Sequence, residues 1–266
     1  MVSQHLEENT QSTQGIYGRR TVLEALRAQR EIEKIFFAFG AEGEGIDTIR
    51  AEAKRRNIPC SIADRQKFAM LEKRIEVGDG AVQGVIALMP LYRPITLEQA
   101  IEQAYTETDT PVFVLLDGIH DPHNVGAIAR SVACAGAHAL VVPTHHGSPI
   151  TSTAMKSSAG ALHHISIVKV PNTSVALKDC KAAGFTIIGT DMHNAQSYDT
   201  PDYDMPTVLV IGSEGSGMKP ETRKLLDLSV TIPLSGQVQS LNASVAAGII
   251  LFEIKRKKRH HTSIKE

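Results

Sequence analysis

No stretch of this 266-residue sequence is apolar over the roughly 20 residues that a membrane-spanning helix requires. The first fourteen residues are polar and lack the basic start and apolar middle of a signal peptide. Cysteine is scarce, and Cys60, Cys134 and Cys180 lie far apart, without a CxxC pair or a histidine spacing suited to zinc. We therefore expect a cytoplasmic protein with free thiols and no membrane segment, in which residues 1–14 are disordered.

Several common catalytic signatures are missing as well. The glycine-rich stretch at residues 212–217 has neither the spacing of GxGxxG nor the Gly-Lys-Ser/Thr ending of a P-loop. No GxSxG nucleophile elbow occurs. His120 and His123 flank Asp121 as in some metal sites, but Pro122 fixes the backbone there and no third ligand follows nearby. These absences disfavour a dinucleotide-binding or P-loop enzyme, a serine hydrolase and a metalloenzyme.

What the sequence does contain is an alternation of helix-like and strand-like segments. Residues 15–90 predict a small α/β domain, with helices at 18–29 and 46–57 and strands at 34–39 and 82–89. Residues 91–110 carry one short helix, at 97–105, between Pro94 and Pro111, and are interpreted as a linker.

A second domain is predicted for residues 111–266. It begins with a nearly continuous apolar run from Pro111 to Leu116, which is typical of a parallel strand covered on both faces. Further strands are predicted at 139–142, 164–168, 185–190, 208–211 and 230–233, and helices at 152–159, 174–183 and 243–254, besides an Ala-rich helix beginning near Asn124. Strand and helix in turn indicate an α/β fold with a doubly wound parallel sheet.

Polar residues follow the ends of the predicted strands. Glu214 lies in the glycine-rich loop after 208–211, and Ser240 and Asn242 follow the strand at 230–233. Asn124 and Arg130 belong to the helix that follows the first strand of the domain. Since open α/β sheets bind ligands beyond the carboxyl ends of their strands, we expect these groups to form a site beside approachable glycine amides.

Each of these residues also has a purely structural interpretation. Asn124 could cap its helix, Glu214 could be an ordinary loop carboxylate, and Ser240 with Asn242 could cap the final helix. Their occurrence together favours a site.

Basic residues are clustered although the net charge is only −1. Residues 15–90 hold thirteen Lys or Arg against eleven Asp or Glu, a net of +2, with clusters at Arg19-Arg20, Lys54-Arg55-Arg56 and Lys73-Arg74. Another cluster occupies 255–259 at the end of the last predicted helix. Two interpretations remain open for all of them: solvated helix faces and helix ends, or contacts to phosphate.

Three segments in order resemble the motifs of the SpoU (TrmH-like) RNA 2′-O-ribose methyltransferases. They are Asp117-Gly118 with 121–131, then 211–218, then 232–236 with 240–248. The chain departs mildly in carrying Ala243 where many relatives have valine. Residues 17–26 resemble the first helix of the L30e-like substrate-binding domain that precedes the catalytic domain in members acting on ribosomal RNA.

This resemblance implies a SPOUT methyltransferase domain with a deep C-terminal α/β knot, S-adenosyl-L-methionine as cofactor, no metal and a homodimer that builds its site from both chains. By position, Gly212, Ile232 and Leu241 would meet the cofactor through backbone groups. Arg130 would lie beside the ribose 2′-hydroxyl, Glu214 would steady the loops, and Asn124, Ser240 and Asn242 would hold Arg130 and the ribose.

The resemblance also implies a substrate. We expect 2′-O-methylation of a ribose, of guanosine, in 23S ribosomal RNA, with residues 15–90 gripping RNA away from the reacting ribose. The alternatives are a tRNA 2′-O-methyltransferase, because the catalytic motifs are shared, and a non-catalytic RNA-binding assembly factor.

Overall fold

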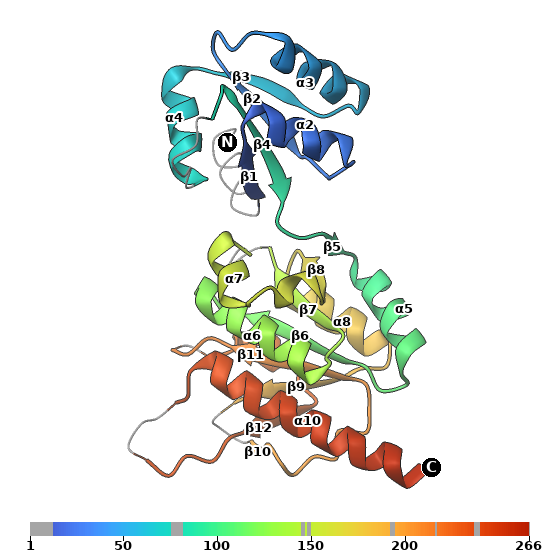
Figure 1. Ribbon diagram of the computed structural model, residues 1–266. Helices are drawn as coiled ribbons and strands as arrows, with labels where there is room; N and C mark the ends of the chain where they lie inside the picture. Colours follow the sequence, from blue (N-terminus) through green and yellow to red (C-terminus); the bar gives the residue numbers. More distant parts are fainter. Residues whose placement is uncertain are drawn as a thin grey trace. The chain divides into compact units, whose positions relative to one another are not determined.

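The computed structural model describes residues 13–75, 82–144, 147, 150–191, 195–215, 217–236 and 240–265, with side chains up to Arg259. The chain forms two compact units, residues 1–91 and 92–266 (Figure 1). Of the predicted disordered N-terminus, residues 1–12 lie outside the described part. The prediction is wrong for Thr13 and Gln14, which begin a strand and pair with Pro90 and Met89.

Unit 1 is a four-stranded sheet in the order β1-β4-β2-β3, covered by helices on both faces. Its strands are β1 (Thr13–Tyr17), β2 (Lys34–Ala38), β3 (Cys60–Ala63) and β4 (Val85–Pro90), and its helices are α2 (Arg19–Arg27), α3 (Glu44–Arg55) and α4 (Arg65–Arg74). Consecutive side chains of a strand point to opposite faces. Phe37 therefore packs with α2 and α3, and Phe36 packs with α4. The sequence pattern missed β1, β3 and α4.

Unit 2 is built on an eight-stranded sheet in the order β10-β12-β9-β11-β6-β7-β8-β5, in which every pair of neighbouring strands is parallel. The strands are β5 (Pro94–Ile95), β6 (Val112–Asp117), β7 (Ala139–Pro143), β8 (Ser166–Val170), β9 (Thr186–Thr190), β10 (Gln196–Ser197), β11 (Thr207–Gly212) and β12 (Leu228–Thr231). All six residues of β6 and all six of β11 are buried, as central parallel strands require.

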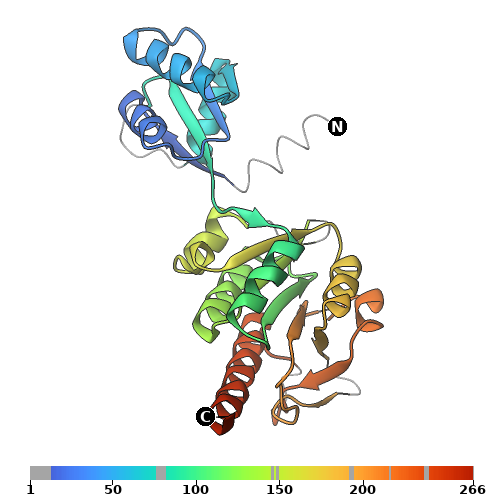
Figure 2. The same ribbon diagram turned by 90° about the vertical axis from the view of Figure 1, so that its right-hand side faces the viewer.

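The helices of unit 2 cover both faces of this sheet. They are α5 (Leu97–Glu107), α6 (Pro122–Ala135), α7 (Ser152–Ser157), α8 (Thr173–Ala182), α9 (Pro220–Arg223) and α10 (Ala243–Lys265), with a 3-10 turn at Ala161–His163. Ala100 of α5 and Leu177 of α8 share one core with Phe113 and Val210 of the sheet. Figure 2 shows α6 and α10 on the side of the sheet away from α8. Helices α6 and α10 pack closely at Gly248, where an added Cβ would come into van der Waals contact with the Ser131 Oγ, 3.4 Å away.

The linker predicted for 91–110 is wrong, because residues from Tyr92 onward belong to unit 2. Pro94 and Ile95 pair with β8. Thr96 then starts α5 through a capping box with Gln99. The apolar stripe of α5 includes the small residues Ala100 and Ala104, both buried, which the sequence pattern did not distinguish from an isolated helix. The units therefore meet within the chain at residues 91 and 92.

Candidate active site

The carboxyl ends of β6 and β11 lie side by side, with Gly212 in register with Asp117. The Asp117 side chain is fully buried. Its carboxylate accepts a hydrogen bond from the Lys219 amide at 2.9 Å and one from the Thr173 hydroxyl at 3.3 Å. A buried carboxylate needs such donors, and these two fasten the chain after β11 and the start of α8 to the end of β6. The sequence predicts Asp117 only as part of the first motif and not as a site residue, although a carboxylate that closes an apolar strand is a usable signal.

The glycine-rich loop after β11 is held closed by its own backbone. The Ser213 and Gly217 amides each donate to the other residue's carbonyl, at 3.1 and 3.0 Å. Gly217 has a φ of +66°, a conformation that favours glycine. The loop therefore presents Glu214 as an exposed carboxylate beyond the end of the sheet.

Glu214 is the centre of a cluster drawn from three distant segments. Its Oε1 accepts hydrogen bonds from the Asn124 side-chain amide at 3.1 Å and from the Ala243 backbone amide at 3.1 Å. The Asn242 side-chain amide donates to the same oxygen, and to Asn124 Oδ1 at 2.9 Å. The cluster thus ties the start of α6, the loop after β11 and the start of α10 to one another.

The capping interpretation of Asn242 also holds. Its Oδ1 accepts from the Ser244 amide at 3.0 Å and the Val245 amide at 3.4 Å, in the first turn of α10. The Glu214 carboxylate accepts from the first amide of the same helix, where negative charge is favourable. One asparagine therefore both starts the helix and joins the cluster.

Arg130 does not join this cluster. It lies on α6 six residues after Asn124, a displacement of roughly 9 Å along the helix and about 240° around it. Its side chain is exposed, and it forms no hydrogen bond or ion pair with any other residue that the structure describes. Asn124 and Asn242 are engaged with Glu214, so the expectation that they hold Arg130 is not met within one chain. Ser240 is exposed, and among the described residues no hydrogen bond joins its side chain to the cluster.

The three predicted cofactor residues lie at strand ends or directly before α10. Gly212 is buried at the end of β11, and Ile232 and Leu241 are half-buried at the two ends of the segment between β12 and α10. Residues 237–239 of this segment, and Ser216 of the glycine-rich loop, lie outside the described part of the chain. The backbones of Ile232 and Leu241 form no hydrogen bonds with described residues, so their amides and carbonyls are available to a ligand.

Gly212→Val is expected to damage the loop itself. A Cβ at this position would lie 2.6 Å from the backbone carbon of Gly217 and 2.6 Å from the Met218 amide nitrogen, so the loop has to move. Overpacking of this kind costs about 1–3 kcal/mol. We expect both a lower melting temperature and weaker cofactor binding, measured by thermal unfolding and by calorimetry. Gly215→Ala is the control, because a Cβ there meets nothing within 4 Å; an unchanged Gly212→Val protein would contradict the geometry.

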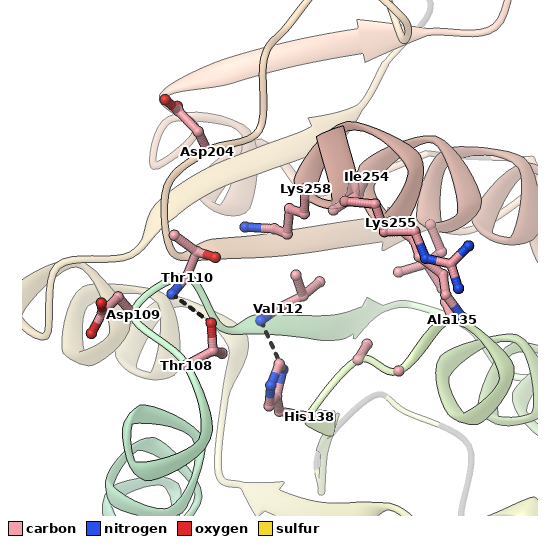
Figure 3. Close-up of a pocket in the computed structure, with 14 residues that line it drawn as sticks. Thr108, Asp109, Thr110, Val112, Ala135, His138, Asp204, Ile254, Lys255 and Lys258 are labelled. Carbon is pink, nitrogen blue, oxygen red and sulfur yellow. Dashed lines mark hydrogen bonds between the residues drawn. The ribbon is translucent and has the colours of Figure 1, made fainter. Parts of the chain in front are cut away.

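A separate cavity of about 520 Å³ lies at the opposite, amino edge of the sheet, where β6 begins (Figure 3). The Lys258 side chain reaches it from α10 and donates to the Met205 carbonyl at 2.9 Å, and its burial lowers the pKa of the ammonium to about 8. His138 Nδ1 accepts from the Val112 amide at 3.1 Å, and burial lowers the pKa of this imidazole. None of the predicted site residues lines this cavity.

The basic run at 255–259 is engaged largely in holding the fold. Lys255 donates to the Cys134 carbonyl in the last turn of α6 at 2.8 Å, which satisfies a helix-end acceptor. Arg256 pairs with Glu253 through two hydrogen bonds. With the bond from Lys258 to Met205, these contacts favour the structural interpretation of the run over a phosphate-binding tail.

Within the described ranges, no group of three or more His, Cys, Asp or Glu side chains is arranged to hold a metal ion. No helix in that part of the chain combines the length and apolarity needed to cross a membrane.

Comparison with known proteins finds two matching family models. The SpoU rRNA Methylase family matches residues 111–252, and the model for RNA 2′-O ribose methyltransferase substrate binding matches residues 16–94. The Bacillus subtilis protein YacO, named as a TrmH-family tRNA/rRNA methyltransferase, is 33% identical over 91% of this chain and 95% of its own length.

Two solved structures are also similar. The AdoMet-bound rRNA methyltransferase from Sinorhizobium meliloti has a TM-score of 0.63 at 22% identity, covering 96% of this chain and 90% of its own. The A. aeolicus TrmH/SpoU tRNA modifying enzyme has a TM-score of 0.53 at 31% identity, covering 63% of this chain and 86% of its own.

Proposed function

We infer the function of this chain from the premise that it belongs to the SpoU rRNA methylase family, as its three motifs predict. The predicted fold class is confirmed: a SPOUT-type α/β methylase domain follows a smaller α/β substrate-binding domain. The chain is therefore an RNA methyltransferase, and S-adenosyl-L-methionine is its methyl donor.

We propose that it methylates the 2′-oxygen of a guanosine ribose in 23S ribosomal RNA. The family model matched by unit 1 is named for binding the substrate of RNA 2′-O ribose methyltransferases. The rRNA methyltransferase from S. meliloti aligns with nearly the whole chain, whereas the tRNA-modifying A. aeolicus enzyme aligns with less than two thirds of it. The presence of unit 1 therefore favours ribosomal RNA over transfer RNA, and the choice of guanosine rests on the motif resemblance.

The cluster around Glu214 is the observation that carries this function. By joining Asn124, Asn242 and the Ala243 amide, it fixes the loop after β11 against the segment that leads into α10. That arrangement suits a cofactor held by the backbone groups of Ile232 and Leu241 beside Gly212. When bound, S-adenosyl-L-methionine supplies a methyl group already activated by its sulfonium, so the protein's task is alignment.

Arg130 is assigned to the ribose. A guanidinium keeps its proton because its pKa exceeds about 12, which makes it a poor general base. We therefore assign Arg130 to orienting the target phosphate and stabilising the developing 2′-alkoxide, while the proton leaves to phosphate or water. Its exposure and its distance along α6 from Asn124 suit action on the site of a second copy of the chain.

A homodimer is expected through α10. Val245, Ile249 and Phe252 recur at helical spacing on one face of α10 and are 49%, 36% and 49% exposed, an apolar stripe on the helix that packs against α6. Complete burial of each such side chain in an interface would stabilise the dimer by about 1.5–3 kcal/mol. Light scattering should therefore give twice the chain mass at micromolar concentration, and Phe252→Asp should give monomers that lack methyl transfer.

The matched control for this prediction is Val175→Asp. Val175 is also 49% exposed, but it lies on α8, over the other face of the sheet. An active monomer of the unmodified protein would sink the dimer assignment, as would equal dissociation by both variants.

Titration calorimetry with S-adenosyl-L-methionine tests the enzyme against the alternative of a non-catalytic assembly factor. A scaffold has no need of the cofactor, so saturable binding at one site per chain supports the proposal. Glu214→Gln should weaken binding, because an amide is a poorer acceptor than a carboxylate for three donors. Absence of any binding heat by the intact protein would refute the proposed cofactor site.

A further inference from the structure

A groove in unit 1 lies between α3 and the edge strand β3. Its volume is about 550 Å³, within the roughly 300–1,000 Å³ typical of small-ligand sites. The lining residues come from the last two turns of α3, the turn after it, β3 and β2, and they include Arg50, Lys54, Asn57, Cys60, Ser61, Ile62 and, from β2, Phe37. No acidic residue is among its lining residues, so the groove is electropositive.

The structure separates available cations from engaged ones within the basic clusters. Arg55 is paired with Glu52 at 2.5 Å. Arg56 donates to the Leu26 carbonyl at 2.8 Å and to the Arg30 carbonyl at 3.0 Å. Arg56 therefore ties the end of α3 to the end of α2, and the charge of Arg55 is paired within its own helix, so both are poor candidates for binding RNA.

Arg19 and Arg20 also have hydrogen-bond or ion-pair partners, whereas Lys54 has no ion-pair partner among the described residues. Arg19 donates to the Gln83 carbonyl at 3.2 Å, and Arg20 pairs with Glu24 at 2.9 Å. Lys54 is exposed. Its ammonium group is therefore accessible to an anion of a bound ligand.

Arg50 lies one helical turn before Lys54, on the same side of α3. Its guanidinium sits over the Phe37 ring, 4.9 Å from the ring centroid. This contact holds the cation in place without neutralising its charge. The groove thus combines one supported guanidinium with one unpaired ammonium.

Apolar surface borders these cations. Ile62 of β3 is 64% exposed, and its register partner on β2 is Phe37. Phe39 directly follows β2 and is 82% exposed, and its amide donates to the Ala63 carbonyl at the end of β3. Ile62 therefore brings exposed apolar surface into the groove that Arg50 and Lys54 line, and apolar surface beside cations is what an unstacked base and its phosphate require.

We propose that the groove between α3 and β3 binds an unpaired nucleotide of the RNA substrate, with the phosphate at Lys54 and Arg50 and the base against Ile62. The inference rests on the proposed function in taking RNA as the substrate. Paired A-form RNA buries its base faces in the stack, so a duplex cannot place a base in the groove. Unit 1 therefore selects an RNA that has a single-stranded segment.

The first test removes the cations. Arg50→Ala with Lys54→Ala should weaken binding of a single-stranded RNA by about tenfold and lower the salt slope by about 0.7, because the groove neutralises one phosphate and each neutralised phosphate of a single strand contributes ~0.7 to that slope. The matched control, Arg65→Ala with Lys73→Ala, removes the same charge from α4 on the opposite face of the sheet. Equally weakened binding in both variants, or an equal effect on duplex RNA, would overturn the proposal.

The second test places RNA in the groove directly. Cys60 lines the groove and is exposed. In a Cys134→Ser background, single-stranded RNA should slow alkylation of Cys60 by at least about tenfold if the nucleotide occupies the groove at saturation. Met70→Cys serves as the reference thiol, because Met70 is 68% exposed on α4. Unchanged Cys60 alkylation in saturating RNA would refute the assignment.

These tests are separable from the proposed function. The Arg50/Lys54 double variant and the Arg65/Lys73 double variant should both bind S-adenosyl-L-methionine as the unmodified protein does. At saturating RNA both should methylate at the unmodified rate. The KM for RNA should be raised only in the Arg50/Lys54 variant. If the unmodified protein failed to bind S-adenosyl-L-methionine but RNA still slowed the alkylation of Cys60, the enzyme assignment would be contradicted and the groove assignment would stand. Normal methylation and KM in the Arg50/Lys54 variant would defeat only the groove.

Discussion

Replacing Arg130 with alanine is expected to lower the turnover of methyl transfer by about 10² or more while leaving affinity for S-adenosyl-L-methionine near normal. The side chain is exposed on α6 and separate from the Glu214 cluster, so its removal breaks no hydrogen bond or ion pair within the described chain. What disappears is the cation that orients the target phosphate and stabilises the developing alkoxide. Single-turnover kinetics together with calorimetry would measure the two quantities independently.

Two further variants sharpen this prediction. Arg130→Lys keeps the charge but not the planar fork of donors, so it should recover only part of the rate. Lys178→Ala removes an exposed cation from α8 and should leave the rate unchanged. Equal losses of cofactor affinity and turnover in Arg130→Ala would contradict the assignment of Arg130 to the ribose.

Deletion of residues 1–91 is expected to abolish methylation of ribosomal RNA while preserving cofactor binding and the dimer. The core that holds the sheet of unit 2 to α5 and α8 is built from residues of unit 2 alone. Without unit 1, the catalytic site keeps its geometry but loses the domain proposed to grip the RNA. Gel filtration, calorimetry and a methylation assay on 23S ribosomal RNA would report the three properties.

The position of the cut matters for this experiment. Deletion of residues 1–110, at the end of the expected linker, would also remove β5 from the edge of the sheet and take Ala100 and Ala104 from the core. That shorter protein should therefore be unstable, unlike the one that begins at Tyr92. Normal ribosomal RNA methylation by the protein that begins at Tyr92, or modification of transfer RNA by the intact one, would contradict the substrate assignment.

The meeting of Asn124, Glu214 and Asn242 could be predicted because it follows from topology. Residues directly beyond the carboxyl ends of parallel strands share one edge of the sheet. The assignment of residues 92–110 to unit 2 could not be predicted, since β5 has only two residues and the apolar stripe of α5 includes small alanines. Both features acquire their place in the core only through long-range pairing.

The basic clusters show a second limit of sequence reasoning. Lys54, Arg55 and Arg56 are adjacent and chemically similar, yet Arg55 and Arg56 are engaged by partners and Lys54 has no ion-pair partner in the described part of the chain. Arg56 is engaged because its guanidinium donates to the carbonyl of Leu26, which is 30 residues away in the sequence. Pattern alone could not assign these roles, because each depends on which acceptor the fold brings within reach.

The most direct test is methyl transfer from labelled S-adenosyl-L-methionine to 23S ribosomal RNA taken from a strain that lacks this protein. The modified position would be mapped as a 2′-O-methyl nucleotide. We expect label at a single guanosine ribose, a position unmethylated in RNA of the deletion strain and methylated by the purified protein. Label on a base, label in transfer RNA alone, or no transfer by a protein that binds the cofactor would contradict the proposed reaction.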